Sequence, residues 1–378
     1  MSFFAGTIQG LPPTGFYAPD FLVEVKGQEL DPESKGDVLS IKIVMALGEI
    51  TSAEITLNNW DDKSVWFKYS DRDSPYAGDP VTVKLGYAGR TVPLLNGEIN
   101  SLTPVFPSSG SPTLRIGVLD LMSRLRGSRP GTDATRQFVE KQYSEIAEEI
   151  GGRHGLTVEA VPDDIVHAET LQGNADDAQF LHLLASRIGY SCYVRTDPEN
   201  GDPVMRFGPP TDGELAASEV DHSCAWGQSL ISFEPTLTMS DQVSQVTVRG
   251  WNHDTMAEIV ATATAADLPG GAGSSGPENA AAGSHREDVV ITADVQTQEE
   301  AAARARGLLQ NRADAYITAK GEVVGIPDLR PGDNMQISEL GTRFSGSYHI
   351  THVEHELGNE GYRTRFEARR ERDGGAGT

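Results

Sequence analysis

The histidines near the C-terminus are the residues whose type and spacing could do chemistry. The stretch SYHITHVEHEL, residues 347–357, holds His349, His352 and His355 with two glutamates beside them. Imidazoles and carboxylates at close spacing bind zinc, and a zinc site would suit a metal-dependent hydrolase. The candidate ligands would be His349 and His355.

The pattern of the same stretch argues against such a site. Ile350 and Val353 are β-branched and glycines flank the run, which indicates a strand and not a helix. Alternation along a strand predicts His349 and His355 on one face and His352 on the other, so the three imidazoles cannot converge on one ion. HExxH is absent, and no third ligand stands at metal spacing. We expect no metal and no cofactor, and the hydrolase stays an alternative.

Other chemical motifs are absent as well. The sequence has no GxSxG, no P-loop and no GxGxxG after a strand, so we expect no catalytic residues and no enzyme. Cys192 and Cys224 have neither CxxC nor Cys/His spacing around them, which excludes a zinc knuckle and a redox dithiol. Two isolated cysteines fit a reducing cytoplasm.

Charge and hydropathy limit the partners. The chain has 378 residues with a net charge of −24, and such a field repels nucleic acid and anionic membranes. We therefore expect no specific nucleic-acid binding. No apolar run approaches the length of a membrane helix, and the N-terminus lacks the basic start of a signal peptide, so we expect no membrane insertion. The acidity would serve either solubility or a passage for anionic cargo.

The elements that must position these residues are mainly strands. Period-two alternation broken by turn residues predicts an antiparallel β unit over 21–128. Helical spacing over YSEIAEEI and over NADDAQFLHLLASRI, with Asn174 as N-cap, predicts an α+β insertion over 129–225. Strands resume over 226–370, with a mobile Ala/Gly/Ser-rich loop at 261–284 and a helix at about 297–316. Residues 1–20 and 371–378 are expected as an extension and a flexible tail.

The two β-rich regions resemble each other. GDPVTVKLG, LNGEINSLTP and PTLRIGVLD in the first correspond to GDNMQISELG, FSGSYHITHV and GYRTRFEAR in the second. Gly97 and Arg115 are 18 positions apart, and Gly346 and Arg365 are 19 apart. We interpret this as two copies of one antiparallel β-barrel type separated by the helical module. Chance similarity between short amphipathic strands is the alternative.

The motifs in order also resemble a known family. YSEIAEEIGGRHGL, LQGNADDAQFLHLLASRIGYSCYVR, VTVRGWNHDTM, GIPDLRPGDNMQI, RFSGSYHITHVEHEL and GYRTRFEARR together resemble the tail hub proteins of contractile phages, of the late control gene D type. These are related to the hub portion of type VI secretion spike proteins and of extracellular contractile injection systems. The resemblance runs from about Phe21 to Arg370 and is weakest over 261–284.

The resemblance implies a structural protein and its partners. Family hubs are homotrimers in which each chain has two similar tail-tube-like barrels, so that a quasi-sixfold ring seats the first ring of the tail tube and carries a threefold spike protein. The helical module would face neighbouring baseplate proteins, and an acidic channel would repel anionic cargo. Such a chain is made in the bacterial or archaeal cytoplasm and joins a phage-tail-like particle or virion baseplate.

Two further expectations follow. Only ERDGGAGT comes after Arg370, so we expect the spike to be a separate polypeptide. A monomeric adhesion or carbohydrate-binding module is another alternative, but it needs exposed aromatic residues, and aromatics make up only 7% of the chain.

Overall fold

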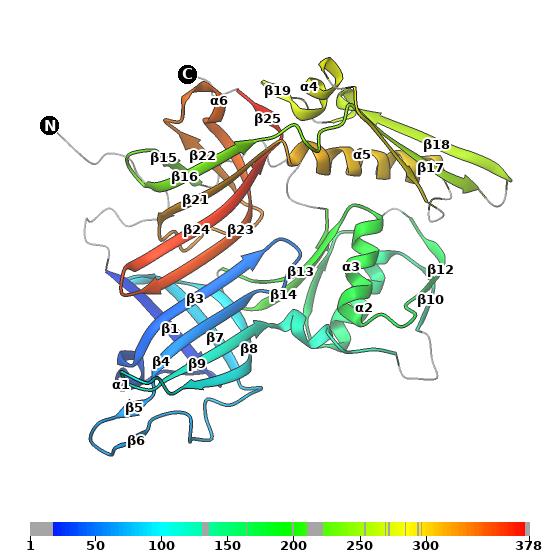
Figure 1. The fold of residues 1–378 in the computed structure, drawn as a ribbon. Coiled ribbons are helices and arrows are strands. Elements are labelled where there is room, and N and C mark those ends of the chain that lie inside the picture. The colour runs from blue at the N-terminus through cyan, green and yellow to red at the C-terminus, as the bar shows by residue number, and fades with distance from the viewer. Residues whose placement is uncertain are drawn as a thin grey trace.

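A computed structural model describes residues 18–374 apart from 131–135, 164, 199, 210–221, 253–254, 269, 271–272, 284, 293–294 and 296. Strands account for 49% of the described residues and helices for 19%, so the expected mainly β class is confirmed. The expected N-terminal extension lies largely outside the described residues. Two β units and two smaller modules make up the fold (Figure 1).

The first β unit is an antiparallel sheet with the strand order β3-β4-β9-β8-β7-β1-β2. Alternating Val, Ile and Leu side chains of these strands enter the core, while polar residues between them face out. Its elements are β1 (Pro19–Val25), β2 (Gln28–Glu29), α1 (Pro32–Gly36), β3 (Val38–Ala46), β4 (Ser52–Asn58), β5 (Trp60–Asp61), β6 (Trp66–Phe67), β7 (Pro80–Tyr87), β8 (Arg90–Val105) and β9 (Thr113–Asp120).

The second β unit has the corresponding strand order β16-β21-β24-β23-β22-β15. Its last pair differs, because β15 runs parallel to β22 whereas β1 runs antiparallel to β7. Its elements are β15 (His222–Ala225), β16 (Leu230–Leu237), β21 (Ile317–Val324), β22 (Asn334–Ser338), α6 (Gly341–Phe344), β23 (Gly346–Gly358) and β24 (Gly361–Arg370). The unit thus begins slightly before the expected residue 226.

The two units form one sheet. The second half of β23 pairs antiparallel with β3, and a single apolar core runs through both units. In the described part of the chain the strand ladders close neither unit into a barrel. The structure thus has two sheets with corresponding strand order in place of the two barrels that we expected.

Two turns carry the clearest sign that the units are copies. YAGD at 76–79 and RPGD at 330–333 each place a glycine at positive φ, +91° and +101°. In each turn the aspartate side chain accepts a hydrogen bond from the backbone N–H three residues earlier, at 2.9 and 2.7 Å. The same local chemistry therefore starts β7 and β22.

The turns fix the correspondence of the next strand. The turn glycine donates to the carbonyl of Ile99 in the first unit and of Ile350 in the second, at 2.8 Å in both. A β-bulge follows each isoleucine. Matching these two residues aligns Gly97 with Tyr348 and not with Gly346, so our sequence alignment of this strand was wrong by two positions. Arg115 and Arg365 do correspond, because they keep the same place relative to the bulges.

The first inserted module follows β9. Its helices bury the apolar stripes expected from their spacing against β11, β13 and β14. The N-cap of α3 is Asp176, which accepts from the backbone N–H of Gln179 at 2.9 Å, and not Asn174 as expected. The elements are β10 (Gln137–Lys141), α2 (Tyr143–Arg153), β11 (Thr157–Ala160), β12 (His167–Leu171), α3 (Asp177–Arg187), β13 (Ser191–Thr196) and β14 (Pro203–Gly208), preceded by a 3-10 helix (Leu121–Leu125).

A second inserted module was not expected. It interrupts the hairpin of β16 and β21, which corresponds to the short turn between β3 and β4. The sheet β18-β17-β20 packs on α5, whose small buried residues Ala301 and Ala305 allow close approach. The elements are β17 (Gln245–Asn252), β18 (Ala257–Thr264), a 3-10 helix (Ala265–Asp267), β19 (Ser274–Ser275), α4 (Gly276–Ala282), β20 (Glu287–Ile291) and α5 (Gln298–Asp314).

The structure differs from two expectations near this module. The described part of 261–284 is not an irregular loop, because Ser275 caps α4 and the end of β18 lies in the sheet. Of the expected flexible tail, β25 (Arg372–Asp373) pairs with β19, and the guanidinium of Arg372 bonds Glu278 at 3.2 Å. The Ala/Gly/Ser-rich composition of 261–284 is that of a linker, and it hid the helix there.

Two glycines test the packing of the fold. A Cβ on Gly97 would lie 2.0 Å from the Leu119 carbonyl oxygen across the β8–β9 ladder, and the backbone cannot retreat without losing ladder bonds. We expect Gly97→Ala to lower the free energy of unfolding by about 1–3 kcal/mol. Gly307→Ala, within α5 and with open space around it, should raise it by about 0.5–1 kcal/mol. Urea unfolding followed by circular dichroism measures both, and equal shifts would contradict the close approach.

Candidate functional site: the charged face of the joined sheet

The outward face of the joined sheet is covered by charged side chains. Alternation along the strands places them opposite one another across seven neighbouring strands. The acids are Glu54, Glu234, Glu322, Glu354, Glu356 and Glu367, and the bases are Lys42, Arg115, Lys320, Arg363, Arg365 and Arg369. We call this surface the charged face.

Arg365 is the centre of the charged face. Its Nη1 donates to Glu354 at 2.9 Å and to Glu356 at 2.7 Å, and these hydrogen bonds raise the pKa of the guanidinium further. Burial alone would raise the pKa of Glu354, but the bonds from Lys42 and Arg365 outweigh it and hold that pKa below its ordinary value. Because Lys42 belongs to β3, the ion pairs cross from one unit to the other.

Acids and bases on the charged face are equal in number, six of each in the sets named above. The excess negative charge of the chain therefore lies elsewhere. Ion pairs between partly exposed groups each contribute about 0.2–1 kcal/mol, so the pairs do not explain the stability of the sheet. They make a hydrated surface without net attraction for a polyanion.

The tail histidines do not share a face. Before the bulge in β23, Tyr348 and Ile350 point into the core, and after it Val353 and His355 do. The extra residue of the bulge reverses the alternation. His349 therefore faces away from the core beside Asn334, whose side-chain oxygen lies 3.3 Å from Nδ1. Our expectation that His349 and His355 lie on one face was wrong for this reason.

His355 is fully buried in a hydrogen-bond network at the junction of the units. Its Nε2 lies 3.1 Å from the carbonyl oxygen of Leu329, which can only accept, so the ring proton sits on Nε2. Nδ1 then accepts from the hydroxyl of Tyr362 at 2.8 Å. Burial, with the nearby charge of Arg330, lowers the pKa of His355 to about 3. His355 is thus a neutral core residue.

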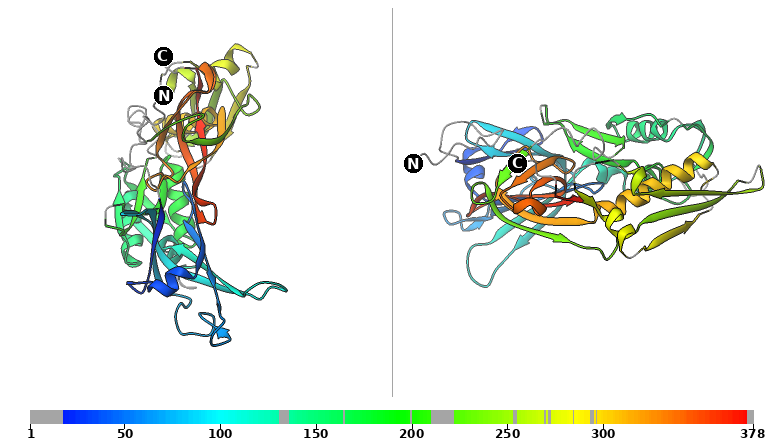
Figure 2. Two further views of the ribbon diagram at one scale, coloured as in Figure 1. Left: turned by 90° about the vertical axis from the view of Figure 1, so that its left-hand side faces the viewer. Right: turned by 90° about the horizontal axis from the view of Figure 1, so that it is seen from above.

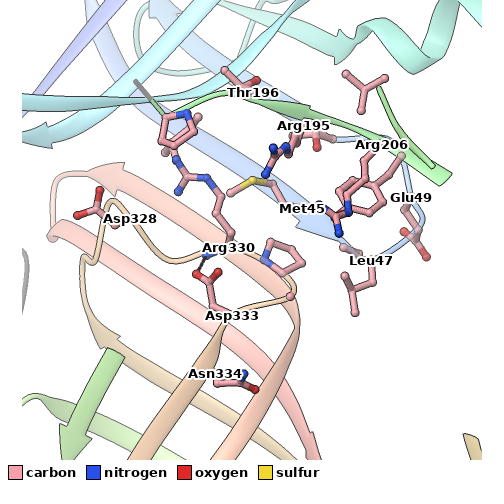
Figure 3. A pocket seen from close by; sticks show the side chains of 18 residues that line it. Met45, Leu47, Glu49, Arg195, Thr196, Arg206, Asp328, Arg330, Asp333 and Asn334 are labelled. Atoms are coloured by element: carbon pink, nitrogen blue, oxygen red, sulfur yellow. Dashed lines mark hydrogen bonds between the residues drawn. The ribbon is translucent and has the colours of Figure 1, made fainter. Parts of the chain in front are cut away.

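A cavity of about 560 Å³ lies where the two β units and the first inserted module meet (Figure 3). Met45 comes from the first unit, Arg195 and Arg206 from β13 and β14, and Arg330 from the turn before β22. Arg330 donates to the carbonyl of Pro93 in β8 at 3.0 Å and to that of Pro327 at 2.6 Å. It therefore ties the units together.

The remaining chemical candidates have structural roles. Cys192 and Cys224 are buried and free, and burial raises the pKa of each thiol to about 12, which leaves no nucleophilic thiolate. Burial raises the pKa of Asp120 to about 7, but its carboxylate caps the 3-10 helix by accepting from Met122. Within the described residues no group of three or more histidines, cysteines and acids could hold a metal ion.

No helix in the described ranges is long and apolar enough to cross a membrane.

Sequence reasoning missed the charged face and Arg330. The alternation of opposite charges in KGEVV and YRTRFEARR is a signal of the former, but the cross-strand register that pairs these charges is a tertiary property.

The burial of His355 makes stability depend on pH. The unfolded chain binds this proton near pH 6.5 and the folded chain only near 3, so the stability that depends on neutral His355 is lost as pH falls below about 6.5. We expect the difference in unfolding free energy between wild type and His355→Gln to shrink by about 1.4 kcal/mol per pH unit below that point. Urea titrations from pH 4.5 to 7.5 measure it, with His352→Gln as control. A difference independent of pH would contradict the neutral buried state.

Comparison with solved structures finds the fold in phage tail proteins. The 43 kDa tail protein of prophage MuSo2 from Shewanella oneidensis has a TM-score of 0.68 at 15% identity, over 93% of this chain and 98% of that one. A tail protein from Neisseria meningitidis has a TM-score of 0.66 at 14% identity, over 94% and 97%.

The same fold occurs in a secretion-system protein. The Escherichia coli c3393 protein, described as a component of the type VI secretion system with structural similarity to the tail proteins gp27 and gp5 of bacteriophage T4, has a TM-score of 0.58 at 14% identity, over 92% of this chain and 76% of that one. The resemblance to tail hub proteins is thus confirmed for the fold.

Sequence comparison gives a family. No curated protein matches the chain in sequence. The model of the Alg8 N-terminal domain family matches residues 18–359, which is most of the chain. The protein belongs to the Alg8 N-terminal domain family.

Proposed function

We propose that this chain is a non-enzymatic hub of a contractile tail or injection-system baseplate. Three copies form a ring that joins a sixfold tail tube to a threefold spike on a separate polypeptide. The observation that carries the proposal is the joint between β23 and β3, which shows how one unit docks on another. The fold shared with tail proteins supports it.

The joint inside the chain serves as a template. β23 has two partners along one edge, β22 over its first residues and β3 from His352 to Leu357. The hairpin of β23 and β24 thereby reaches over the neighbouring unit (Figure 1). A strand can do this because the bulge and its length of 13 residues carry it past its own unit.

In the part of the chain that the structure describes, the corresponding edges toward the two ends of the sheet have no strand partner. In the described residues, β8 beyond Asn100 pairs only with β9, and β16 pairs only with β21. The hairpin of β8 and β9 projects from the body of the first unit (Figure 2). It corresponds to the hairpin of β23 and β24, and β16 corresponds to β3. Unpaired edges of this length invite pairing with another chain.

A second copy completes the pattern if its β16 pairs with β8. This contact joins two different surfaces, and such contacts close a ring of three chains when each turns the next copy by a third of a full rotation. Three chains give six equivalent units, which matches a sixfold tube. The shared register places Thr103 opposite Thr236, as Glu354 stands opposite Val44. Pro104 then faces Pro235, and because neither donates a backbone hydrogen bond, this joint is weaker than the internal one.

The charged face would line the channel of this ring. Its charges are balanced, so it neither strongly attracts nor strongly repels a passing polymer. The lining would thus be a hydrated surface of paired side chains and not an acidic one. The inserted modules lie to one side of the joined sheet (Figure 1), where neighbouring baseplate proteins would reach them. The first ring of the tail tube and the spike occupy the two ends of the ring.

The metal-dependent hydrolase is not proposed. His355 is enclosed by Tyr362, Thr364 and the Leu329 carbonyl, and His349 faces the other side of β23. The candidate ligands therefore cannot bind one ion.

The first test of the ring is its mass. Light scattering coupled to size exclusion should give a species of three times 40.6 kDa at micromolar chain concentration or above. The weak Pro104–Pro235 pair makes the mass depend on concentration, so the measurement is repeated over a dilution series. A monomer at every concentration would contradict the proposal.

A cross-link tests the register. Thr103→Cys with Thr236→Cys should form disulfides between chains under a mild oxidant, because facing residues of antiparallel strands bring their Cα atoms within about 4.5–5.5 Å. The two positions lie at opposite ends of the sheet, so no disulfide forms within a chain. We expect covalent species of two and three chains and none larger. Thr103→Cys with Ser232→Cys, four residues out of register, is the control, and equal cross-linking there would contradict the pairing.

A further inference from the structure

Four aromatic residues gather at the end of the first unit. Trp60, Trp66, Phe67 and Phe106 form a chain of ring contacts, with centroids 5.6 Å apart for Trp60 and Phe67, 5.7 Å for Trp66 and Phe67, and 5.3 Å for Phe67 and Phe106. They come from β5, β6 and the residue after β8. We call them the aromatic cluster.

The aromatic cluster is open to solvent although it is large and apolar. Trp66 is 57% exposed, Phe106 60% and the adjoining Val65 63%. Val65 has φ +52°, a conformation that β-branched residues rarely adopt, and the indole N–H of Trp66 donates to Asp71 at 3.0 Å. The hairpin thus holds the rings in a defined position outside the core. An exposed, ordered aromatic group of this kind is typical of a contact surface.

The internal joint shows what would cover it. At that joint Leu357, near the end of β23, stands opposite Ile41. A Cβ added to Gly358 would lie 3.6 Å from the Ser40 Cβ and 3.8 Å from the carbonyl oxygen of Leu39. Leu39 is the bulged residue of β3, so it has no partner in the ladder with β4, and it is 45% exposed.

The same features occur at the free edges. Phe106 corresponds to Leu357, and Phe233 corresponds to Ile41. β16 carries the same bulge as β3, and its bulged residue Ile231 is 41% exposed. The turn before β16 exposes Trp226, at 52%. A neighbouring copy docked as at the internal joint would therefore bring these apolar residues to the aromatic cluster.

We propose that the aromatic cluster is the docking site for the start of β16, residues 226–233, of a second copy of this chain. The inference rests on the proposed ring and names the contact that holds it. Backbone pairing at this joint is interrupted at the two prolines, so burial of Trp66 and Phe106 against Ile231 and Trp226 supplies the affinity that the hydrogen bonds do not. A few central aromatic residues commonly carry most of the binding energy of an interface.

Substitutions on the two sides test the contact. Phe106→Ser and Ile231→Ser should each raise the dissociation constant of the trimer by about 30-fold, and the double variant should lose less than the product of the two because both remove one contact. Ile291→Ser, on the exposed face of β20 and 80% exposed, is the matched control and should change nothing. Sedimentation velocity over a dilution series measures all four proteins, and circular dichroism melts confirm that each is folded.

The outcomes separate the inference from the ring. If the wild type is trimeric and Phe106→Ser dissociates like Ile291→Ser, the docking site is overturned while the ring stands. If Phe106→Ser weakens the trimer but Ile231→Ser does not, the occupant is not the start of β16 and the inference is likewise overturned. A monomeric wild type overturns both. Tryptophan emission gives a second readout, because burial of Trp66 and Trp226 on assembly should shift it to the blue.

Discussion

The arrangement of the molecule depends on how β23 divides one of its edges. A strand has two edges, and β24 occupies one of them along most of β23. The other edge is shared, first by β22 of the same unit and then by β3 of the first unit. The bulge between Ile350 and His352 makes this possible because it turns the second half of the strand while keeping Val353 and His355 in the core. Two sheets thereby become one, with a common core.

The inserted modules are attached without disturbing that sheet. Each has its own apolar core, and Ile50, in the turn between β3 and β4, packs against the core of the first module. The first is held by polar contacts, such as the backbone N–H of Asn96 bonding the Thr196 hydroxyl at 3.0 Å, and by the packing around Arg330. The second replaces a short turn. Insertions of this kind are tolerated because they join two strand ends that are already adjacent.

The duplication gives the chain two chemically different kinds of joint, the internal one between β23 and β3 and the free edges of β8 and β16. The internal joint has His355 and Ile43 in the core and Lys42 and Glu354 outside, whereas the free edges carry prolines, threonines and the aromatic cluster. The same strand arrangement thus carries two different sets of side chains. At the internal joint the two units belong to one chain, whereas the free edges are available to another copy. Prolines on both free edges also limit pairing with unrelated strands.

The sequence by itself determined the β class, the α+β insertion, the helix at about 297–316 and the correspondence of Arg115 with Arg365, since these follow from periodicity, caps and turn residues that act locally. It placed His349 and His355 on one face, which was wrong because a bulge adds one residue without leaving a mark in composition. It also aligned Gly97 with Gly346, which was wrong because the turns before β7 and β22, and not these glycines, fix the correspondence of the strands. It also gave residues 261–284 the composition of a linker, although Ser275 caps a helix there. Only the tertiary structure decided that β23 pairs with β3, that the charged face is balanced and that the aromatic cluster is exposed, because each depends on register between strands distant in the chain.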